Sequence, residues 1–223
     1  MSSLRLTWLL LHKDLRIAAR SREVLGFMLL FALLCVVVFA FGFLREGRAA
    51  EEQVPGVLWV TLLFTGTVGL LRLFAAEEEA GTLDLVARTR AGTGPLFWSK
   101  ALLQLAFSGI VTAFLLPVVL VFFDARLHGL GWVLTSLVLG LIGQAVLGTL
   151  SAALLVHVRL REALLPLVLY PLLAPLLLGG VKVTALAMGQ APEDALFGWL
   201  ELMVAFDAVV VVLSPWLFGR AIL

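Results

Sequence analysis

The sequence predicts an all-α integral membrane protein with six transmembrane helices, an N-terminal amphipathic interfacial helix and both termini in the cytoplasm. Three observations lead to this fold class. Hydrophobic residues make up 62% of the chain and charged residues 14%, against roughly 25% charged in soluble domains. Six apolar stretches are each long enough to cross the ~30 Å hydrocarbon core of a bilayer, which takes about 20 helical residues. Lysine and arginine are distributed unevenly among the segments between these stretches.

The first element, residues 4–20, is too polar to span a membrane but is amphipathic as a helix. Four apolar residues follow the spacing of one helical face: Leu4, Trp8, Leu11 and Leu15. Most of the arginines and lysines of this segment fall elsewhere on the helix. A basic amphipathic helix with leucine and tryptophan on one face is typical of the membrane surface. We therefore predict a helix lying flat on the cytoplasmic face, where it anchors the first span.

Six spans follow in order, joined by short connections. Their predicted bounds are 24–44, 54–75, 97–123, 130–156, 163–183 and 197–219. The outer connections are too short to fold into a domain, so we expect no sizeable extracytoplasmic part.

Proline and glycine give two of these spans individual features. Three prolines in the fifth span predict a kink or a local opening, because proline removes a backbone donor; they are Pro166, Pro171 and Pro175. Three glycines in the fourth span predict a face on which a neighbouring helix packs closely; they are Gly140, Gly143 and Gly148.

The positions of lysine and arginine predict the orientation. Twelve of the sixteen lie in the N-terminal segment, in the 72–100 region, at 157–163 or at the C-terminus. The opposite set of segments holds four: Arg45, Arg48, Arg126 and Lys182. Because positive residues concentrate on the cytoplasmic side, both termini are predicted to lie there. The net charge of +1 gives no reason to expect a nucleic-acid partner.

The connection at 77–94 is the most informative segment between spans. Gly81 can adopt the left-handed conformation that ends a helix, and Thr82 can then cap a short new helix. On that helix, Leu83 and Val86 predict an apolar contact, either with a groove in a cytoplasmic partner or with the bilayer surface. The residues of this connection do not decide between these two interpretations.

Several motifs along the chain resemble one known family. The most specific run from the second predicted span to the third: Val54-Pro-Gly-Val-Leu-Trp-Val60, Arg72-x-Phe74-x-x-Glu77-x-Glu79-x-Gly81-x-Leu83-Asp84 and Lys100. Further matches cover nearly the whole length: Lys13-Asp-Leu-Arg16, Arg20-Ser-Arg-Glu23, Pro117 and Leu213-Ser-Pro215. Together they are similar to heme exporter protein B, the membrane permease subunit of the cytochrome c maturation ABC transporter.

The resemblance implies a single ABC-2-type permease domain over residues 1–223, in the bacterial cytoplasmic (inner) membrane. It implies a homodimer, and a cytoplasmic ABC ATPase subunit docked on a coupling helix in the 77–94 loop. The implied ATPase-docking residues are Glu77, Glu79, Gly81, Leu83, Asp84 and Val86. A haem-handling membrane protein and a small membrane subunit complete the implied complex.

The function implied is haem export, or the ATP-driven release of a haem-loaded periplasmic chaperone. Two alternatives stay open at this point. One is an ABC-2-type permease for another cargo, such as a lipid, a drug or a polysaccharide. The other is a scaffold that transports nothing and couples ATP hydrolysis to chaperone release.

The sequence has no motif for catalysis of its own. No Gly-x-x-x-x-Gly-Lys-Ser/Thr phosphate loop occurs, so we expect a non-catalytic subunit with ATP hydrolysis on a separate chain. We predict no metal site and no resident cofactor, and haem is expected only as a ligand that is transported or handled. His128 is a candidate haem ligand because it is the one histidine expected on the outer side, although a lone loop histidine is more often solvated. The single cysteine, Cys35, excludes a disulfide within the chain.

Three charged residues fall inside or at the ends of the last two spans. Asp207 lies near the middle of the sixth span, where a carboxylate costs roughly 2.5–3.5 kcal/mol on insertion scales. It should therefore face protein or water, either lining a dimer cavity or hydrogen-bonded as a neutral acid to a neighbouring helix. Glu201 lies nearer the outer end, at a depth where it could meet Lys182 of the fifth span.

Overall fold

The computed structural model describes residues 3–21, 23–45, 48–49, 51–75, 93–190 and 195–222. Its α-helices are α1 (Ser3–Ser21), α2 (Glu23–Gly42), α3 (Val54–Arg72), α6 (Gly94–Phe122), α7 (Leu130–Leu154), α8 (Arg161–Ala187) and α9 (Leu196–Ile222). Six of them, all except α1, are long and apolar enough to cross a membrane. The predicted fold class, six transmembrane helices after a separate N-terminal helix, is confirmed.

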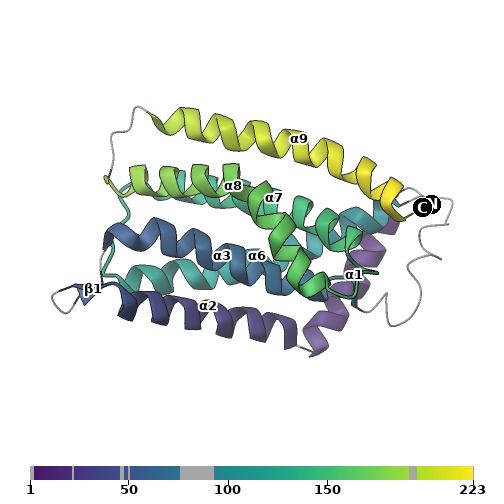
Figure 1. Cartoon of the computed structure of the whole chain (residues 1–223), viewed down its shortest axis with the longest axis horizontal. Helices are drawn as coiled ribbons and strands as arrows, with labels where there is room; N and C mark the ends of the chain where they lie inside the picture. Colours follow the sequence, from purple (N-terminus) through teal and green to yellow (C-terminus); the bar gives the residue numbers. More distant parts are fainter. Residues whose placement is uncertain are drawn as a thin grey trace.

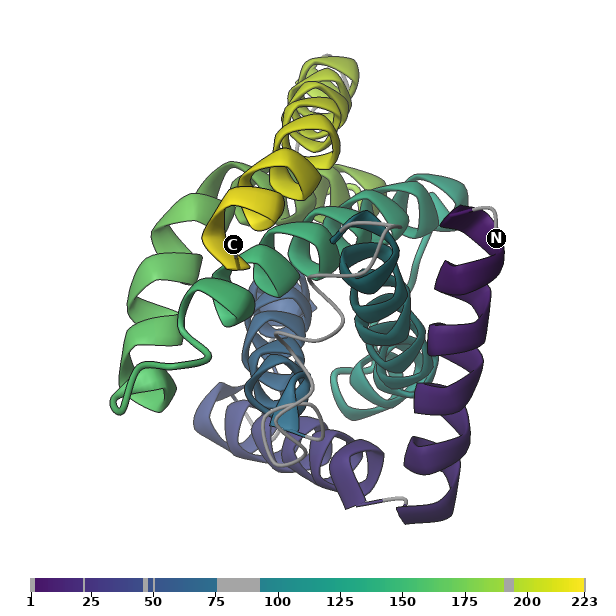
Figure 2. The same ribbon diagram turned by 90° about the vertical axis from the view of Figure 1, so that its right-hand side faces the viewer.

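The six long helices run alongside one another, with α9 along one edge of the bundle and α2 along the opposite edge (Figure 1). Helix α1 and the C-terminal end of α9 lie at the same end of the bundle (Figure 1). An even number of spans requires this arrangement, because each span reverses the direction of the chain. At this end α1 runs across the bundle rather than along it (Figures 1 and 2). This position suits a helix that lies in the plane of a membrane surface. We call this end, formed by α1, 72–75, 93–98 and 218–222, the terminal end.

The amphipathic face predicted for α1 is divided between the bundle and its surroundings. Leu11 is buried and Leu15 is partly buried against the bundle, whereas Leu4 and Trp8 are exposed. Exposed leucine and tryptophan at a membrane surface can enter the lipid headgroup region. The predicted face therefore both packs on protein and remains free to contact lipid.

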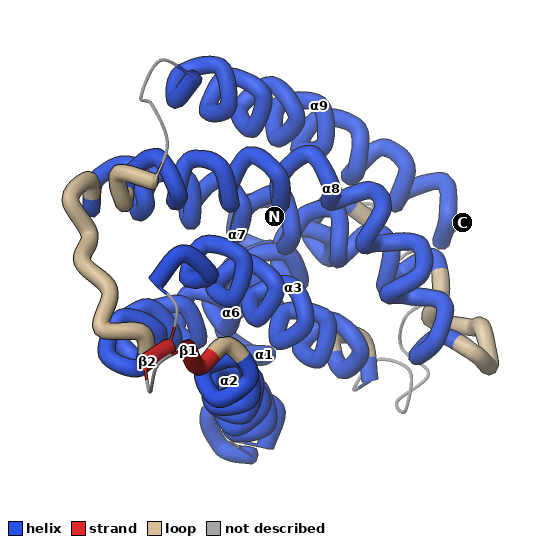
Figure 3. The backbone as a smooth tube through the Cα atoms, turned by 60° about the vertical axis from the view of Figure 1, so that its left-hand side comes forward, coloured by secondary structure: helices blue, strands red, loops and turns tan. Residues whose placement is uncertain are grey.

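The opposite end of the bundle is closed by short irregular structure. Strands β1 (Leu44–Arg45) and β2 (Arg48–Ala49) pair antiparallel after α2 (Figure 3). A 3₁₀ turn, η1 (Glu51–Gln53), leads into α3. The side chain of Glu51 accepts a hydrogen bond from the backbone N–H of Arg126 at 3.1 Å, and the Glu51 carbonyl accepts one from Gln190 Nε2 at 3.2 Å. These contacts join three connections at this end.

Helices α3 and α7 form the centre of the bundle. Each buries 72% of its apolar span against the rest of the chain, compared with 22% for α2 and 28% for α9. The glycine face predicted on the fourth span explains part of this close packing. A Cβ added at Gly140 would overlap the ring of Trp59, and one added at Gly148 would overlap Leu70. The indole N–H of Trp59 donates to Thr184 Oγ1 at 2.9 Å, which also fixes α8 against α3.

Two buried glutamines hold α3 from opposite neighbours. Gln104 of α6 donates from Nε2 to the carbonyl oxygen of Gly66 at 2.9 Å. Gln144 of α7 donates from Nε2 to the carbonyl oxygens of Leu62 and Leu63, both at 3.2 Å. Hydrogen bonds between membrane helices contribute about 0.6–2 kcal/mol each. The middle of α3 is therefore fixed on both sides by side-chain amides.

The fifth span is not locally opened at its prolines, but Figure 1 shows α8 bending along its length, which is the kink that the sequence predicted as the alternative. Helix α8 continues without a break from Arg161 to Ala187 through all three prolines, Pro166, Pro171 and Pro175. Each proline removes a single N–H donor. Because the prolines are separated by several residues, the backbone hydrogen bonds between them maintain the helix.

Candidate functional site

The site of interest is the terminal end, because the chain leaves α3 and enters α6 there on either side of the predicted coupling helix. The six predicted ATPase-docking residues, Glu77, Glu79, Gly81, Leu83, Asp84 and Val86, lie outside the described residues. The structure does describe both ends of the segment that carries them. The contacts of those two ends determine which helices would move if a partner displaced the segment.

An aromatic cluster joins the two ends. Phe218 of α9 lies beside Phe74, at the end of α3, and beside Phe97, in the first turn of α6. Its ring centroid is 6.4 Å from that of Phe74 and 5.1 Å from that of Phe97. All three side chains are buried. A Cβ added at Gly219 would lie 3.0 Å from Thr93 Oγ1, so α9 also packs closely on the residue before α6.

A buried ion pair connects the same region to α1. Lys100 Nζ, in the second turn of α6, lies 2.9 Å from Asp14 Oδ2. The two side chains are 2% and 5% exposed. Lys100 Nζ also lies 5.8 Å from the ring centroid of Phe74, within the range of a cation–π interaction. Taking two charges out of water costs several kcal/mol per ion, so each of these groups depends strongly on the other.

Lys100 and Asp14 belong to separate sequence motifs, and these motifs did not predict that the two residues form an ion pair. The sequence does indicate that Asp14 needs a partner, because it lies three residues after Leu11 and directly before Leu15, on the apolar face of the helix. An acid within an apolar helical face must either be solvated or find a buried cation. The pairing itself depends on α1 crossing the end of α6, which no local pattern gives.

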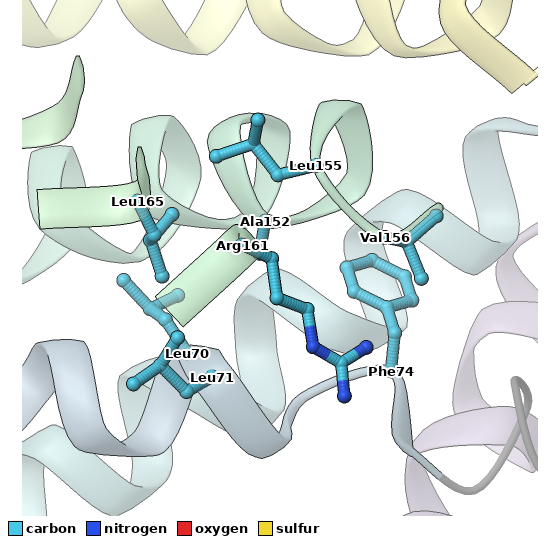
Figure 4. A pocket seen from close by; sticks show the side chains of 8 residues that line it. All are labelled: Leu70, Leu71, Phe74, Ala152, Leu155, Val156, Arg161 and Leu165. Carbon is cyan, nitrogen blue, oxygen red and sulfur yellow. The ribbon is translucent and has the colours of Figure 1, made fainter. Parts of the chain in front are cut away.

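A small pocket lies beside Phe74, between the end of α3, the end of α7 and the start of α8. Figure 4 shows Arg161 extending toward Phe74 among apolar side chains. The pocket has a volume of about 10 Å³, which is at most enough for a single water molecule. This part of the terminal end is therefore packed rather than hollow, and it has no room for a cofactor.

The intramembrane charged residues are separated in the structure. Asp207 is 6% exposed and faces protein: a Cβ added at Gly143 would overlap its carboxylate. No described group donates a hydrogen bond to either of its oxygens, so the predicted bond to a neighbouring helix is not found there. Lys182 and Glu201 are both exposed, and no ion pair between them occurs in the described part of the chain. The expected meeting of these two residues is wrong.

His128 lies exposed in the connection between α6 and α7. It forms no ion pair and no side-chain hydrogen bond within the described ranges. Across those same ranges, no three histidine, cysteine or acidic side chains come together as metal ligands would. The structure therefore gives no reason to prefer His128 as a haem ligand.

Comparison with known proteins finds similarity over almost the whole chain. The family model described as "CcmB protein" matches residues 5–223. The chain belongs to the CcmB protein family. Among its relatives, "Heme exporter protein B" of Paracoccus denitrificans is 32% identical over 217 residues, which are 96% of each chain. The protein of the same name from Rhodobacter capsulatus is 32% identical over 214 residues, again 96% of each.

A more distant similarity extends beyond the CcmB family. The "Probable ABC transporter permease protein NosY" of Pseudomonas aeruginosa is 36% identical over 102 residues, which are 43% of this chain and 37% of that one. This chain, with six helices long enough to cross a membrane, shares a segment with a permease of another name.

Proposed function

We propose that this protein is the membrane permease subunit of a bacterial ABC complex that acts in cytochrome c maturation. It would do so by exporting haem or by driving the release of a haem-loaded periplasmic chaperone. The observation that carries this proposal is similarity over 96% of both chains to proteins named heme exporter protein B. The family match over residues 5–223 includes all six spans and the connections between them.

The proposed location is the cytoplasmic (inner) membrane, with both termini in the cytoplasm. Twelve of sixteen lysines and arginines support this orientation. With that orientation, the terminal end faces the cytoplasm, and so does the 77–94 loop. A cytoplasmic ATPase subunit would then have direct access to the predicted coupling helix.

ATP hydrolysis is assigned to that separate subunit, and the loop at 77–94 is assigned to its docking. Residues Phe74 and Phe97, at either side of the loop, both pack on Phe218 of α9. Lys100, one turn further along α6, pairs with Asp14 of α1. A displacement of the loop would therefore act on four helices at once rather than on a single flexible connection. Two copies of the chain, a haem-handling membrane protein and a small membrane subunit complete the proposed complex.

The second candidate is a permease of the same type for another cargo, favoured by the similarity to the permease named NosY. Purification of the tagged chain from native membranes, with identification of the proteins that accompany it, separates the two. Recovery of a haem-handling protein with an ATPase supports cytochrome c maturation, whereas an ATPase alone favours another cargo. Haem uptake by vesicles containing the purified complex would then separate export from a scaffold that only drives chaperone release.

The same purification tests the docking loop. The double variant Gly81→Pro with Leu83→Asp disrupts the predicted coupling helix and its apolar contact. It should lose the ATPase while still inserting in the membrane, because apolar anchors carry much of the energy of an interface. Ala91→Ser, a small change in the same loop outside the predicted docking residues, serves as the matched control and should retain the ATPase. Full ATPase recovery with the double variant would contradict the assignment.

A further inference from the structure

We propose that the groove between α2 and α3 at the terminal end is a binding site for one aminophospholipid of the membrane. In this site Arg72 binds the lipid phosphate, Glu23 accepts hydrogen bonds from the headgroup ammonium, and an acyl chain lies against Phe27, Phe31 and Val68. The proposal concerns lipid contacts of this chain and does not depend on which cargo the complex handles.

The groove is charged at one end and apolar along the rest of its length, as a lipid molecule is. Its two charged residues stand at the terminal end, Glu23 in the first turn of α2 and Arg72 in the last turn of α3. Since α2 and α3 are consecutive spans that run in opposite directions, Phe27 and Val68 lie about one turn deeper on their respective helices. Phe31 lies one turn deeper again. A headgroup would therefore sit at the membrane surface and an acyl chain would run toward the middle of the bilayer.

The groove is large enough to hold part of a lipid. Its volume is about 370 Å³, within the range of small-molecule sites in proteins. A second pocket of about 110 Å³ adjoins it and shares Val24 and Arg72 with it. That pocket reaches under α1 to the Asp14–Lys100 ion pair. Phe27 is 63% exposed beside the groove, so the site is open to the surrounding membrane.

The charges in the groove favour a ligand with both a phosphate and an ammonium group. Arg72 is exposed, and within the described ranges it forms no ion pair or hydrogen bond. A guanidinium binds phosphate through two parallel hydrogen bonds. Two other cations at this end are engaged: Lys100 pairs with Asp14, and Arg220 stacks 3.8 Å from the Trp216 ring centroid. The carboxylate of Glu23 would repel a purely anionic headgroup, and it matches the ammonium of an aminophospholipid instead.

Lipid retention by the purified full-length chain tests this proposal. Delipidated protein in detergent is mixed with equal amounts of dioleoyl phosphatidylethanolamine and dioleoyl phosphatidylglycerol, and native mass spectrometry counts the lipids that stay bound. We expect one retained phosphatidylethanolamine per chain and at least a fivefold preference for it over phosphatidylglycerol. Arg72→Gln should lower its occupancy at least fivefold, and Glu23→Gln should remove the preference. Arg220→Gln, at the same end but on α9, should change neither.

Several results would overturn the proposal. Equal phosphatidylethanolamine occupancy in Arg72→Gln and in the unmodified chain would do so, as would the absence of any headgroup preference in the unmodified chain. If Arg72→Gln fails to fold, Val68→Phe, which narrows the groove without changing its charge, should lower occupancy by a similar factor, and unchanged occupancy refutes the site. Efficient disulfide cross-linking between two Phe27→Cys chains in a Cys35→Ser background would show that a second copy occupies the groove instead.

Discussion

Removing the carboxylate of Asp14 should destabilise the protein far more than removing the amine of Lys13, although the contact distances are nearly equal. Asp14 Oδ2 lies 2.9 Å from Lys100 Nζ, and Asp14 Oδ1 lies 3.0 Å from Lys13 Nζ. The Lys100 side chain is 2% exposed, whereas that of Lys13 is 48% exposed. Solvent exposure, not distance, therefore distinguishes the two ion pairs.

The expected magnitudes follow from this difference. Asp14→Asn removes the carboxylate that pairs with the buried Lys100 ammonium, and breaking a buried ion pair costs about 3–5 kcal/mol. Lys13→Ala removes a half-exposed pair that contributes roughly 0–1 kcal/mol. With about 2–4 °C of Tm per kcal/mol for a chain of this size, Asp14→Asn should lower Tm by roughly 6–20 °C, against at most about 4 °C for Lys13→Ala. Raising the salt concentration should change the effect of Asp14→Asn little, because a buried pair is poorly screened.

Thermal unfolding of the detergent-purified protein, followed by tryptophan fluorescence at one fixed scan rate, measures these shifts. The double variant Asp14→Leu with Lys100→Met should recover most of the stability lost in either single variant, because it removes both charges and leaves apolar groups of similar size. Equal shifts for Asp14→Asn and Lys13→Ala would refute the reasoning. So would a double variant less stable than both single ones.

Two further predictions concern the packing of the bundle. Gly180→Leu should prevent folding, because a Cβ there would overlap the Trp59 ring, whereas Gly198→Leu faces open space and should be tolerated; the monodisperse fraction on size-exclusion chromatography reports both. Asp207→Leu should raise Tm, since it removes a buried carboxyl without a described hydrogen-bond donor, a group that costs about 1–3 kcal/mol. A lower Tm in that variant would reveal a partner for the carboxylate, such as a second copy of the chain.

The spans and their order could be predicted because bilayer thickness imposes one length on every crossing helix. The glycine face of the fourth span was likewise visible, since small residues at helical spacing have few uses in a membrane other than close packing. Its counterpart, Gly180 of the fifth span, was not identified. Gly180 makes room for the same Trp59 ring, and nothing in its own neighbourhood indicates that a tryptophan from another helix lies there.

The contacts of the candidate site depend on helix rotation and on the crossing of α1, which composition and spacing do not determine. Lys182 and Glu201 have suitable depths for an ion pair, yet each side chain faces outward. Phe218 joins the two ends of the predicted docking loop, but the chain holds 15 phenylalanines and most are expected in apolar spans. Depth could be predicted from sequence, whereas the direction in which a side chain points could not.

Covalently bound haem in c-type cytochromes tests the central proposal most directly. In the native bacterium, deletion of this chain should abolish holocytochrome c, measured by haem-peroxidase staining and by the absorbance of membrane and periplasmic fractions. Re-expression of the unmodified chain should restore it, and re-expression of the Gly81→Pro, Leu83→Asp variant should not, because docking of the ATPase is lost. Normal holocytochrome c levels in the deletion strain would contradict the proposed function.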